Sequence, residues 1–509
     1  MDNDGCLLST AAVQASAMTL SQKLILVIVL SLGLLPRLYK INNPVADWHS
    51  HRQADTASVT RNFDTKGINF LVPTYHDLSN VQSGSDNPQG YRMVELPVYN
   101  LLSEIFFRNT QKLFPQISLE MASRWVSLIF SLGSAFMIFM VVYQNTNSFW
   151  PSLLASAVFL FLPFSIYYSR AILPGSTAMF FMLLALYLFR INIIFSALAF
   201  ALAVLIRPFT AFIITPTLAV YTFQKYLKIL SIKNLVYLII FSIISMGPFF
   251  WWRHWIQQFS AGIPSSAWLF NVTGKPFLPE WIHGFNVSFI NHFIAFRPMW
   301  FNWLFHERLA KLILASYGLI PFFLGFAYRK NNAQKLSFSL FAGMIFYFII
   351  VAGGNIRHDY YQFLIMPVIA IIVGFGLYYM ANFVFKSLPF SIFSVVIISL
   401  ATIYFSWSQI SPYYNINNPD IIDAGRKVNE IIPKNSLVVA PYQGDTAFLY
   451  QTNHSGYPTE IYDVTAIKKE NPSLPLYFVS VNYDNYTNSM IKTYKTIYRN
   501  DHFIILDLN

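Results

Sequence analysis

Two acidic residues near the start of the chain, Asp55 and Glu95, have the chemistry of a general base. Asp55 lies in the string His49-Ser-His-Arg-Gln-Ala-Asp-Thr-Ala-Ser58, and Glu95 lies in Tyr91-Arg-Met-Val-Glu-Leu-Pro97. A carboxylate within hydrogen-bond reach of a hydroxyl group can accept its proton, which contributes about 10²–10⁴-fold in rate. The alternative roles are structural. Asp55 could cap or pair with a surface helix, and Glu95 could pair with Arg92.

Several basic residues have the chemistry of a phosphate site. A guanidinium group offers a fixed fork of donors to phosphate oxygens and stabilises developing negative charge without reorganising. The candidates are Arg52, Arg170, Arg207, Arg253, Arg357 and His358. For arginines at the ends of hydrophobic segments, such as Arg207 before Pro208, the alternative is an anchor that extends to lipid headgroups. His49 and His51 have no third ligand beside them, so no metal site is predicted.

The elements that must position these residues are mainly hydrophobic. Of the 509 residues, 55% are hydrophobic and 11% are charged, against about 25% charged in an average soluble domain. This composition excludes an ordinary water-soluble surface and indicates an α-helical polytopic membrane protein. The 49 Phe and 30 Tyr residues are typical of anchoring at membrane interfaces. The net charge of +11 then favours anionic lipid or phosphate as a partner over nucleic acid.

A membrane-spanning helix needs about 20 mainly apolar residues. The sequence predicts about eleven such helices, near residues 22–39, 124–143, 149–168, 173–189, 191–206, 208–224, 235–252, 311–328, 336–352, 362–384 and 389–408. We interpret the first as an uncleaved span rather than a signal peptide, because it lacks an Ala-x-Ala pattern and is followed by Arg37 and Lys40.

Lysine and arginine residues in the short loops predict a cytoplasmic N-terminus. In that orientation the inner loops hold Lys23, Arg190, Lys225, Lys228, Lys233, Arg329, Lys330, Lys335 and Lys386. Three polar segments, 40–123, 253–310 and 410–509, then fall on the outer side. We therefore expect chemistry at the outer face, with residues 1–410 forming a transmembrane catalytic domain and residues 411–509 an extracytoplasmic one.

The tail after residue 410 is predicted to be a small α/β unit. Asn418 and Pro419 can begin a helix that buries apolar residues at helical spacing up to Ile431. Short apolar runs at Leu437–Ala440, Leu476–Val481 and Phe503–Leu508 are typical of buried strands. The tail carries no glycine-rich phosphate loop and no metal cluster, so we interpret it as a lid or docking domain.

The string from Trp48 through Arg52-Gln-Ala-Asp-Thr-Ala57 resembles the first periplasmic loop of bacterial GT-C glycosyltransferases. The nearest branch is related to protein O-mannosyltransferases and to aminoarabinose transferases that modify lipid A. Glu95-Leu-Pro97 is similar to that family's acidic-(Lys)-Pro-Pro segment. Arg170-Ala-Ile-Leu-Pro174 is similar to its arginine-to-proline turn, although Gly175 stands where many relatives carry an acid. Arg357-His-Asp-Tyr-Tyr361 resembles its late outer turn, and the likeness covers about residues 20–410.

The resemblance implies an inverting glycosyltransferase of the bacterial inner membrane, with Asp55 as the essential acid. The donor would be a polyprenyl-phosphate-linked hexose or pentose. The acceptor would be lipid A, a polysaccharide or a protein on the periplasmic side. Relatives sometimes bind a divalent metal near the site, but its ligands are not identified in this sequence.

Two other functions compete with this interpretation. A transporter or flippase of lipid-linked sugars would carry ionisable groups within its spans and an internal repeat, whereas the predicted spans are nearly free of charge. An enzyme of the O-antigen ligase type has its key loop late in the chain, whereas the acidic cluster here is early. The sugar, the acceptor and the length of the lipid carrier depend on pocket shape and are not predicted.

Overall fold

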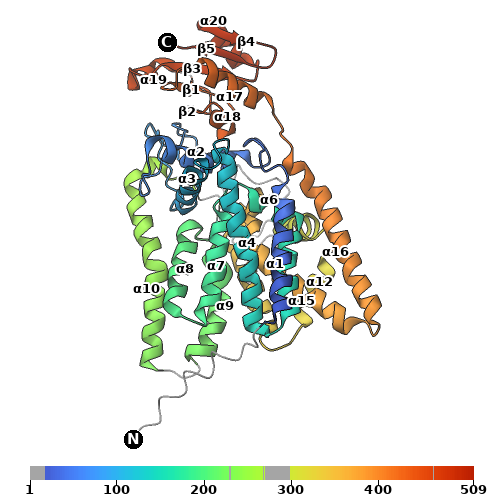
Figure 1. Ribbon diagram of the computed structural model, residues 1–509. Helices are drawn as coiled ribbons and strands as arrows, with labels where there is room; N and C mark the ends of the chain where they lie inside the picture. The colour runs from blue at the N-terminus through green and yellow to red at the C-terminus, as the bar shows by residue number, and fades with distance from the viewer. Residues whose placement is uncertain (1–17, 228–230, 267–268, 270–297, 462) are drawn as a thin grey trace.

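The computed structural model describes residues 18–227, 231–266, 269, 298–461 and 463–509. Cys6 and residues 267–268 and 270–297 of the predicted outer segment 253–310 therefore lie outside the described residues. Long helices form a bundle, two further helices cover one end of it, and a small sheet lies beyond them (Figure 1). Of the candidate catalytic residues, Asp55 lies on the first of these two helices and Glu95 lies in the loop before the second.

The bundle is made of helices of very different lengths. They are α1 (Leu20–Leu34), α4 (Leu119–Thr146), α5 (Phe149–Phe161), α6 (Pro163–Arg170), α7 (Gly175–Phe189), α8 (Ile193–Ile206), α9 (Thr210–Thr222), α10 (Ile232–Trp255), α11 (Pro298–Asn302), α12 (Leu319–Leu324), α13 (Ala333–Ile350), α14 (Ala352–Arg357), α15 (Met366–Tyr379) and α16 (Leu388–Ile410). Shorter π- and 3-10-helical segments extend several of them, among them Trp303–Ile313 and Asp359–Ile365.

Among the described residues, six helical segments are long and apolar enough to cross a membrane. The pair α5 and α6 would add a seventh span, although the two helices meet at 65°. The predicted segments 173–189, 191–206, 208–224 and 311–328 contain shorter or interrupted helices. The helical membrane architecture is thus present, and the count of eleven spans stays a prediction.

The bend between α5 and α6 has a local cause in the sequence. Pro163 has no backbone N–H and disfavours a helical conformation at the residue before it. Leu162 accordingly has extended backbone angles, φ −67° and ψ 123°. As a result α6 carries Tyr167, Tyr168 and Arg170 beneath the loop that leads into the next helix.

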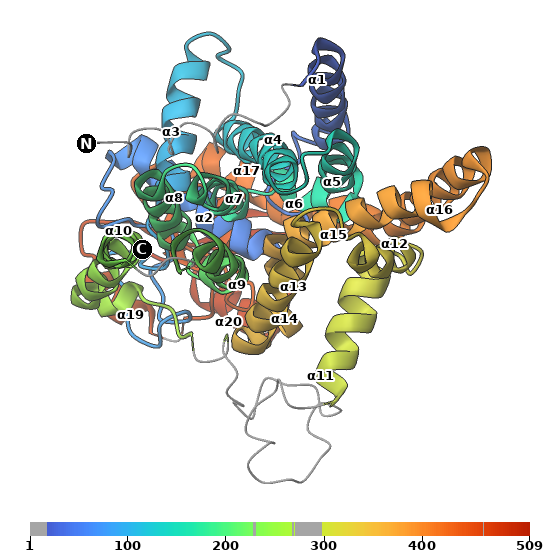
Figure 2. The ribbon, with the colours of Figure 1, turned by 90° about the horizontal axis from the view of Figure 1, so that it is seen from below.

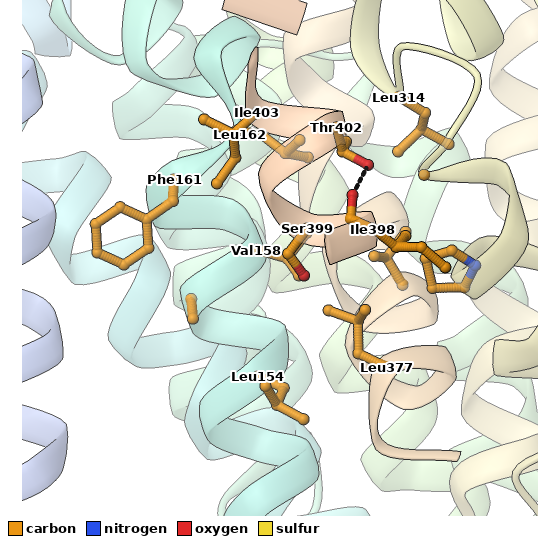
Figure 3. A pocket seen from close by; sticks show the side chains of 14 residues that line it. Leu154, Val158, Phe161, Leu162, Leu314, Leu377, Ile398, Ser399, Thr402 and Ile403 are labelled. Carbon is orange, nitrogen blue, oxygen red and sulfur yellow. Dashed lines mark hydrogen bonds between the residues drawn. The ribbon is translucent and has the colours of Figure 1, made fainter. Parts of the chain in front are cut away.

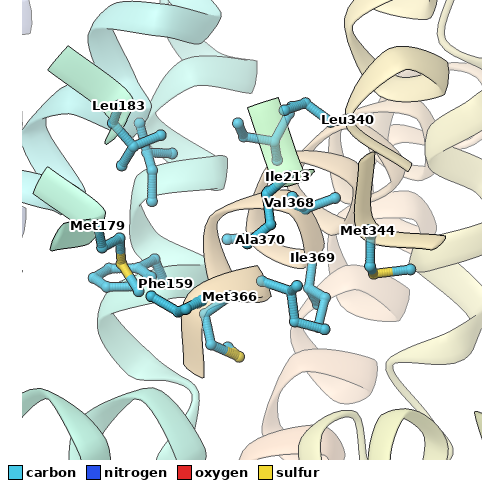
Figure 4. Close-up of a cluster of buried hydrophobic side chains, with 14 of the residues drawn as sticks. Phe159, Met179, Leu183, Ile213, Leu340, Met344, Met366, Val368, Ile369 and Ala370 are labelled. Carbon is cyan, nitrogen blue, oxygen red and sulfur yellow. The ribbon is translucent and has the colours of Figure 1, made fainter. Parts of the chain in front are cut away.

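Helix α15 lies at the centre of the bundle and α16 lies at its edge. In the apolar stretch of the span Asp359–Val384, 89% of the residues are buried, whereas in that of Leu388–Tyr414 only 11% are buried. Helix α16 projects away from the other helices (Figure 2). Buried side chains of α5, α7, α9, α13 and α15 meet around Ile369 and Ala370 (Figure 4). Gly374 allows close packing, because a Cβ atom there would lie 2.5 Å from the backbone of Ala155.

Helices α2 (Ser50–Lys66) and α3 (Val98–Gln111) cover the end of the bundle. The sequence predicts a helix over 52–63 on the membrane surface, and α2 contains it. The side chains from Gln53 to Thr60 are all buried, which a helix with one face in water would not show. The reason is that the C-terminal domain lies on top of α2.

The C-terminal domain is a mixed α/β unit, as expected. Its helices are α17 (Asp420–Ile431), α18 (Thr446–Gln451), α19 (Val464–Glu470) and α20 (Asn485–Thr493). Its strands are β1 (Leu437–Val439), β2 (Ser455–Tyr457), β3 (Leu476–Ser480), β4 (Lys495–Arg499) and β5 (Ile504–Asp507), in the order β2-β1-β3-β5-β4. β1 is parallel to β2 and β3, while β5 is antiparallel to β3 and β4. The three predicted strands are present, and the short β2 and the exposed β4 were not predicted.

The domain is joined to α2 by both apolar and polar contacts. Ala54 and Ala57 of α2 share one buried cluster with Phe448 of α18. The loop after α2 pairs with β2, since Leu78 N donates to Gly456 O at 2.8 Å and Gly456 N donates to His76 O at 2.9 Å. The candidate site therefore lies between α2, on the side of the bundle, and α18, on the side of the C-terminal domain.

Candidate active site

The carboxylate of Asp55 is fully buried and accepts hydrogen bonds from three side chains. Arg92 Nη2 lies 2.6 Å from Oδ2, and Thr446 Oγ1 donates to Oδ1 at 2.7 Å. Gln82 Nε2 is a weaker donor, at 3.4 Å from Oδ1 and 3.2 Å from Oδ2. His51 Nε2 is 4.0 Å from Oδ2. The partners come from α2, from the loop after it and from the C-terminal domain.

Charge and hydrogen bonding keep Asp55 ionised in spite of its burial. Burial alone would raise the pKa of this carboxyl group. Arg92, then His51 and Arg52, and the Thr446 hydrogen bond together lower the pKa of Asp55 below its ordinary value. The group is therefore negatively charged at neutral pH, as a general base must be.

Glu95 forms a second buried ion pair beside the first. Arg52 Nη2 lies 2.5 Å from Glu95 Oε1, and both side chains are 11% exposed. Burial opposes ionisation of Glu95, while Arg52 and then Arg207 lower the pKa of Glu95 below its usual range. The sequence left open a pair between Glu95 and Arg92, but the structure pairs Glu95 with Arg52 and Arg92 with Asp55. The two carboxylates and these two arginines line one small cavity.

Arg207 follows α8 and is a buried arginine with an unused guanidinium group. The residue is only 7% exposed. Its charge reaches Glu95, Tyr360 and Tyr361, yet its side chain forms no hydrogen bond or ion pair with any residue that the structure describes. Burying a charge without a partner is costly, so this geometry fits an anionic ligand.

The other basic candidates lie in different surroundings. Arg170 is 1% exposed and pairs with Asp47 at 2.6 Å, beneath Tyr167 and Tyr414. This buried pair connects α6 to the loop before α2. The charge of Arg170 is balanced by Asp47, so Arg170 is less suited to bind a phosphate than was predicted. Arg253 is exposed at the end of α10.

Arg357 and His358 are half-buried on the turn between α14 and the Asp359–Ile365 segment. The His358 ring stacks on Tyr360, with ring centroids 5.3 Å apart. Since Tyr360 lies within the field of both Arg52 and Arg207, His358 borders the cavity region. No group of three or more His, Cys, Asp or Glu residues that could hold a metal ion occurs among the described residues.

Sequence reasoning missed Arg92, Gln82 and Thr446 as partners of Asp55. Arg92 is three residues from Glu95, so its position in the acidic string was an available indication. Thr446 is separated from Asp55 by 391 residues, and nothing in the short helix around it distinguishes it from an ordinary first-turn threonine. Only the docking of the C-terminal domain brings it to the carboxylate.

An apolar groove lies at mid-height in the bundle, between α5 and the outlying α16 (Figure 3). Its volume is about 150 Å³. Leu154, Val158 and Leu162 line one side and Ile398, Thr402 and Ile403 the other. Helix α5 ends at Phe161, within the lining of the groove, whereas α16 continues past the groove to Ile410. The Thr402 hydroxyl donates to Ile398 O at 2.7 Å, so the surface of the groove is almost wholly apolar.

Comparison with known proteins gives the fold. No protein-family model and no curated protein sequence matches the chain. The structure is similar to that of ArnT from Cupriavidus metallidurans bound to undecaprenyl phosphate, with a TM-score of 0.58, 11% identity, and 95% of this chain and 97% of that chain covered. The apo form of ArnT gives a TM-score of 0.59 at 11% identity, covering 96% and 98% of the two chains.

The archaeal oligosaccharyltransferase AglB from Archaeoglobus fulgidus, in complex with an inhibitory peptide and a dolichol-phosphate, is also similar. Its TM-score is 0.54 at 12% identity, with 91% of this chain and 69% of that chain covered. Both neighbours are GT-C glycosyltransferases. The chain therefore has the GT-C fold, which confirms the fold expected from the string around Asp55.

Proposed function

We propose that this protein is an inverting glycosyltransferase that moves a hexose or pentose from a polyprenyl-phosphate donor to an extracytoplasmic acceptor. The observation that carries the proposal is the buried, ionised Asp55 in a cavity shared with Arg52, Arg92 and Glu95. The solved neighbours support the donor class, because ArnT is bound to undecaprenyl phosphate and AglB is in complex with a dolichol-phosphate. Lipid A, a polysaccharide or a protein would be the acceptor.

Asp55 acts as the general base in this proposal. The Gln82 amide is its most distant hydrogen-bond donor, so we place the acceptor hydroxyl where Gln82 now lies. The hydroxyl proton passes to Asp55 while the oxygen attacks the anomeric carbon of the donor. The bond from that carbon to the phosphate oxygen breaks, and its electron pair leaves with the lipid phosphate. A single displacement of this kind inverts the anomeric centre.

Arg207 binds the leaving phosphate, and Arg52 helps it while also holding Glu95. A guanidinium group aimed at developing negative charge costs no reorganisation at the moment of reaction. Arg52 has given one donor to Glu95, whereas Arg207 keeps its donors for a ligand. His358, which stacks on Tyr360, and the adjacent Arg357 are the remaining residues predicted for this phosphate site. Arg253 contributes only to the surface charge.

The apolar groove between α5 and α16 takes part of the polyprenyl tail. Helix α16, which borders the groove, runs from it toward the site. The lining of the groove is almost wholly apolar, as a prenyl chain requires. In this arrangement the molecule crosses the bacterial inner membrane about eleven times, with the N-terminus in the cytoplasm. Residues 1–410 form the catalytic membrane domain, and residues 411–509 form the periplasmic one.

Replacement of Asp55 tests the proposal. Cell-envelope glycans are compared by mass spectrometry in a strain that lacks the protein and in the same strain carrying wild type, Asp55→Asn or Asp64→Asn. Asp64 is an exposed carboxylate on the same helix, so Asp64→Asn should restore the glycan. Asp55→Asn should lower transfer by about 10²–10⁴-fold.

Two results would contradict the proposal. Unchanged glycans in the strain without the protein would exclude glycosyl transfer and favour transport. Full restoration by Asp55→Asn would remove Asp55 as the base. Thermal unfolding of the purified variant separates lost chemistry from lost folding, because Asp55 also holds Arg92.

A further inference from the structure

A second buried carboxylate, Asp359, accepts hydrogen bonds from four side chains in three parts of the chain. Tyr168 of α6 donates to Oδ1 at 2.5 Å, and the hydroxyl of Tyr413, just after α16, donates to Oδ2. Trp48 Nε1 lies 3.3 Å from both oxygens. His49 Nε2 is 2.6 Å from Oδ1. Asp359 is only 1% exposed, so these donors replace its hydration.

The contact with Asp359 fixes which nitrogen of His49 is available. The carboxylate accepts a hydrogen bond from Nε2–H, which leaves Nδ1 as the second polar atom of the ring. Nδ1 forms no hydrogen bond with any residue in the described part of the chain. The His49 side chain is 17% exposed, so part of the ring is accessible to a ligand.

The backbone at His49 is held in an unusual conformation. His49 precedes α2 with φ 56° and ψ 35°, in the left-handed region that non-glycine residues rarely adopt. In this conformation the imidazole contacts Asp359.

His49 borders the same polar region as the arginines of the proposed site. Its ring centroid is 5.1 Å from that of Tyr360 and 5.4 Å from that of His358. Tyr360 in turn lies within the field of Arg52, Arg207 and Glu95. Thus Tyr360 lies close both to His49 and to the arginines of the proposed site.

We propose that His49, positioned by Asp359, is a further binding and catalytic residue for the lipid phosphate. The inference rests on the proposed function and deepens it. The imidazolium donates a hydrogen bond from Nδ1 to the phosphate oxygen that carries the sugar. As the bond between that oxygen and the anomeric carbon breaks, the proton moves from Nδ1 to the oxygen. His49 regains a proton from water after the lipid phosphate leaves, so the step balances with the proton taken by Asp55.

Other charged and titratable groups surround the pair of His49 and Asp359. Arg308 of the Trp303–Ile313 segment lies 3.9 Å from Asp359. Burial lowers the pKa of His358 to about 3, so that ring is neutral at physiological pH. The remaining titratable neighbours, from α2, α6, the Asp359–Ile365 segment and the end of α16, are His51, Arg52, Tyr360, Tyr168 and Tyr413.

Binding of undecaprenyl phosphate and of undecaprenol to the purified full-length protein tests the proposal. His49→Gln should weaken binding of undecaprenyl phosphate roughly 10- to 100-fold, as expected for loss of a charged hydrogen bond, and leave undecaprenol binding unchanged. The control is His306→Gln, because His306 is an exposed histidine paired only with Glu307. It should bind both lipids as wild type does.

The selectivity between the two lipids separates a phosphate contact from a structural role. Asp359→Asn, which alters the partner of His49 Nε2, should also weaken binding of undecaprenyl phosphate and leave undecaprenol binding unchanged, while thermal unfolding checks that both variants remain folded. Equal weakening for both lipids, or full phosphate selectivity in His49→Gln, would overturn the proposal.

These outcomes are distinguishable from failure of the proposed function. The binding measurement requires no sugar transfer, and Asp55→Asn should keep the selectivity for phosphate over alcohol. If Asp55→Asn proved fully active while His49→Gln lost phosphate selectivity, the base assignment would fail and the phosphate subsite would stand.

Discussion

At the scale of single residues, Asp55 has to satisfy two opposed requirements. It must be ionised to accept a proton, and its buried position penalises that charge. The negative charge is stabilised by hydrogen bonds from Arg92, Gln82 and Thr446. They also occupy the oxygen lone pairs that an acceptor hydroxyl needs. The Gln82 contact is the longest of the three, so we expect an acceptor hydroxyl to replace it, and Arg92, which also donates to Gln82 Oε1, to adjust with it.

Thr446→Val tests the part that the C-terminal domain plays in this balance. The Thr446 hydrogen bond lowers the pKa of Asp55, so its removal should raise that pKa. Activity requires the carboxylate and is lost as pH falls through its pKa. The acidic limb of kcat/KM should therefore move to higher pH in Thr446→Val and return to the wild-type position in Thr446→Ser. An unchanged limb in Thr446→Val would show that the hydroxyl does not tune the base.

The sequence could predict the acids but not their partners. Asp55 and Glu95 stand in strings whose residue types already indicate chemistry, and the structure brings them to one cavity. Thr446 could not be predicted, because its role depends on a contact made across most of the chain. Arg170 illustrates the opposite case. An arginine at an outer turn was expected to face phosphate, and its nearest anion is the buried Asp47.

At the scale of elements, helix α2 shows what local pattern can and cannot establish. Its extent was predicted to within a few residues from its composition alone. Its surroundings were not, since a helix of mainly polar residues was expected to lie at the surface. The polar residues of α2 are instead buried against hydrogen-bond partners in other elements, such as Asn100 of α3, which donates to Thr56 O at 2.7 Å.

The loop that follows α2 and pairs with β2 contains another buried acid, Asp77. Its pKa is shifted in the opposite direction from that of Asp55. Asp77 is fully buried next to the strand pairing with Gly456. Burial raises the pKa of Asp77 from 3.8 to about 6, although Ser79 N donates to it at 2.8 Å. Folding is therefore opposed by ionisation of Asp77 above about pH 6.

Asp77→Asn should stabilise the protein at neutral pH. In wild type the penalty is absent below pH 4 and grows as pH rises to about 6, because the folded state holds its proton more tightly than the unfolded state. A rise of about two pKa units corresponds to about 3 kcal/mol. The midpoint of thermal unfolding of Asp77→Asn should exceed that of wild type at pH 7.5 and match it near pH 4. Asp86→Asn, at an exposed position on the same loop, should show no difference at either pH.

At the scale of the whole molecule, the structure separates a polar, charged end of the bundle from an apolar interior. The buried ion pairs of Asp55, Glu95 and Asp47 lie on or beside α2, and α2, α3 and the C-terminal domain lie at one end of the bundle (Figure 1). The bundle below them has a continuous apolar core around α15. Helix α16 departs from this core, and the groove beside α5 is the result. The order of hydrophobic segments could be predicted from the sequence, whereas the outward lean of α16 could not, because its apolar residues fit lipid and protein equally well.

Ala157→Trp tests whether the groove between α5 and α16 holds the lipid tail. Ala157 lines the groove, and an indole ring there would fill space that a prenyl chain could otherwise use. Affinity for undecaprenyl phosphate should fall roughly tenfold, since a few buried methylene groups account for that loss. Affinity for geranyl phosphate, whose short tail does not extend down the bundle, should stay unchanged. Leu235→Trp on the exposed face of α10 is the matched control and should alter neither affinity. A loss shared equally by the long and the short lipid would place the tail elsewhere, because only the groove discriminates by chain length.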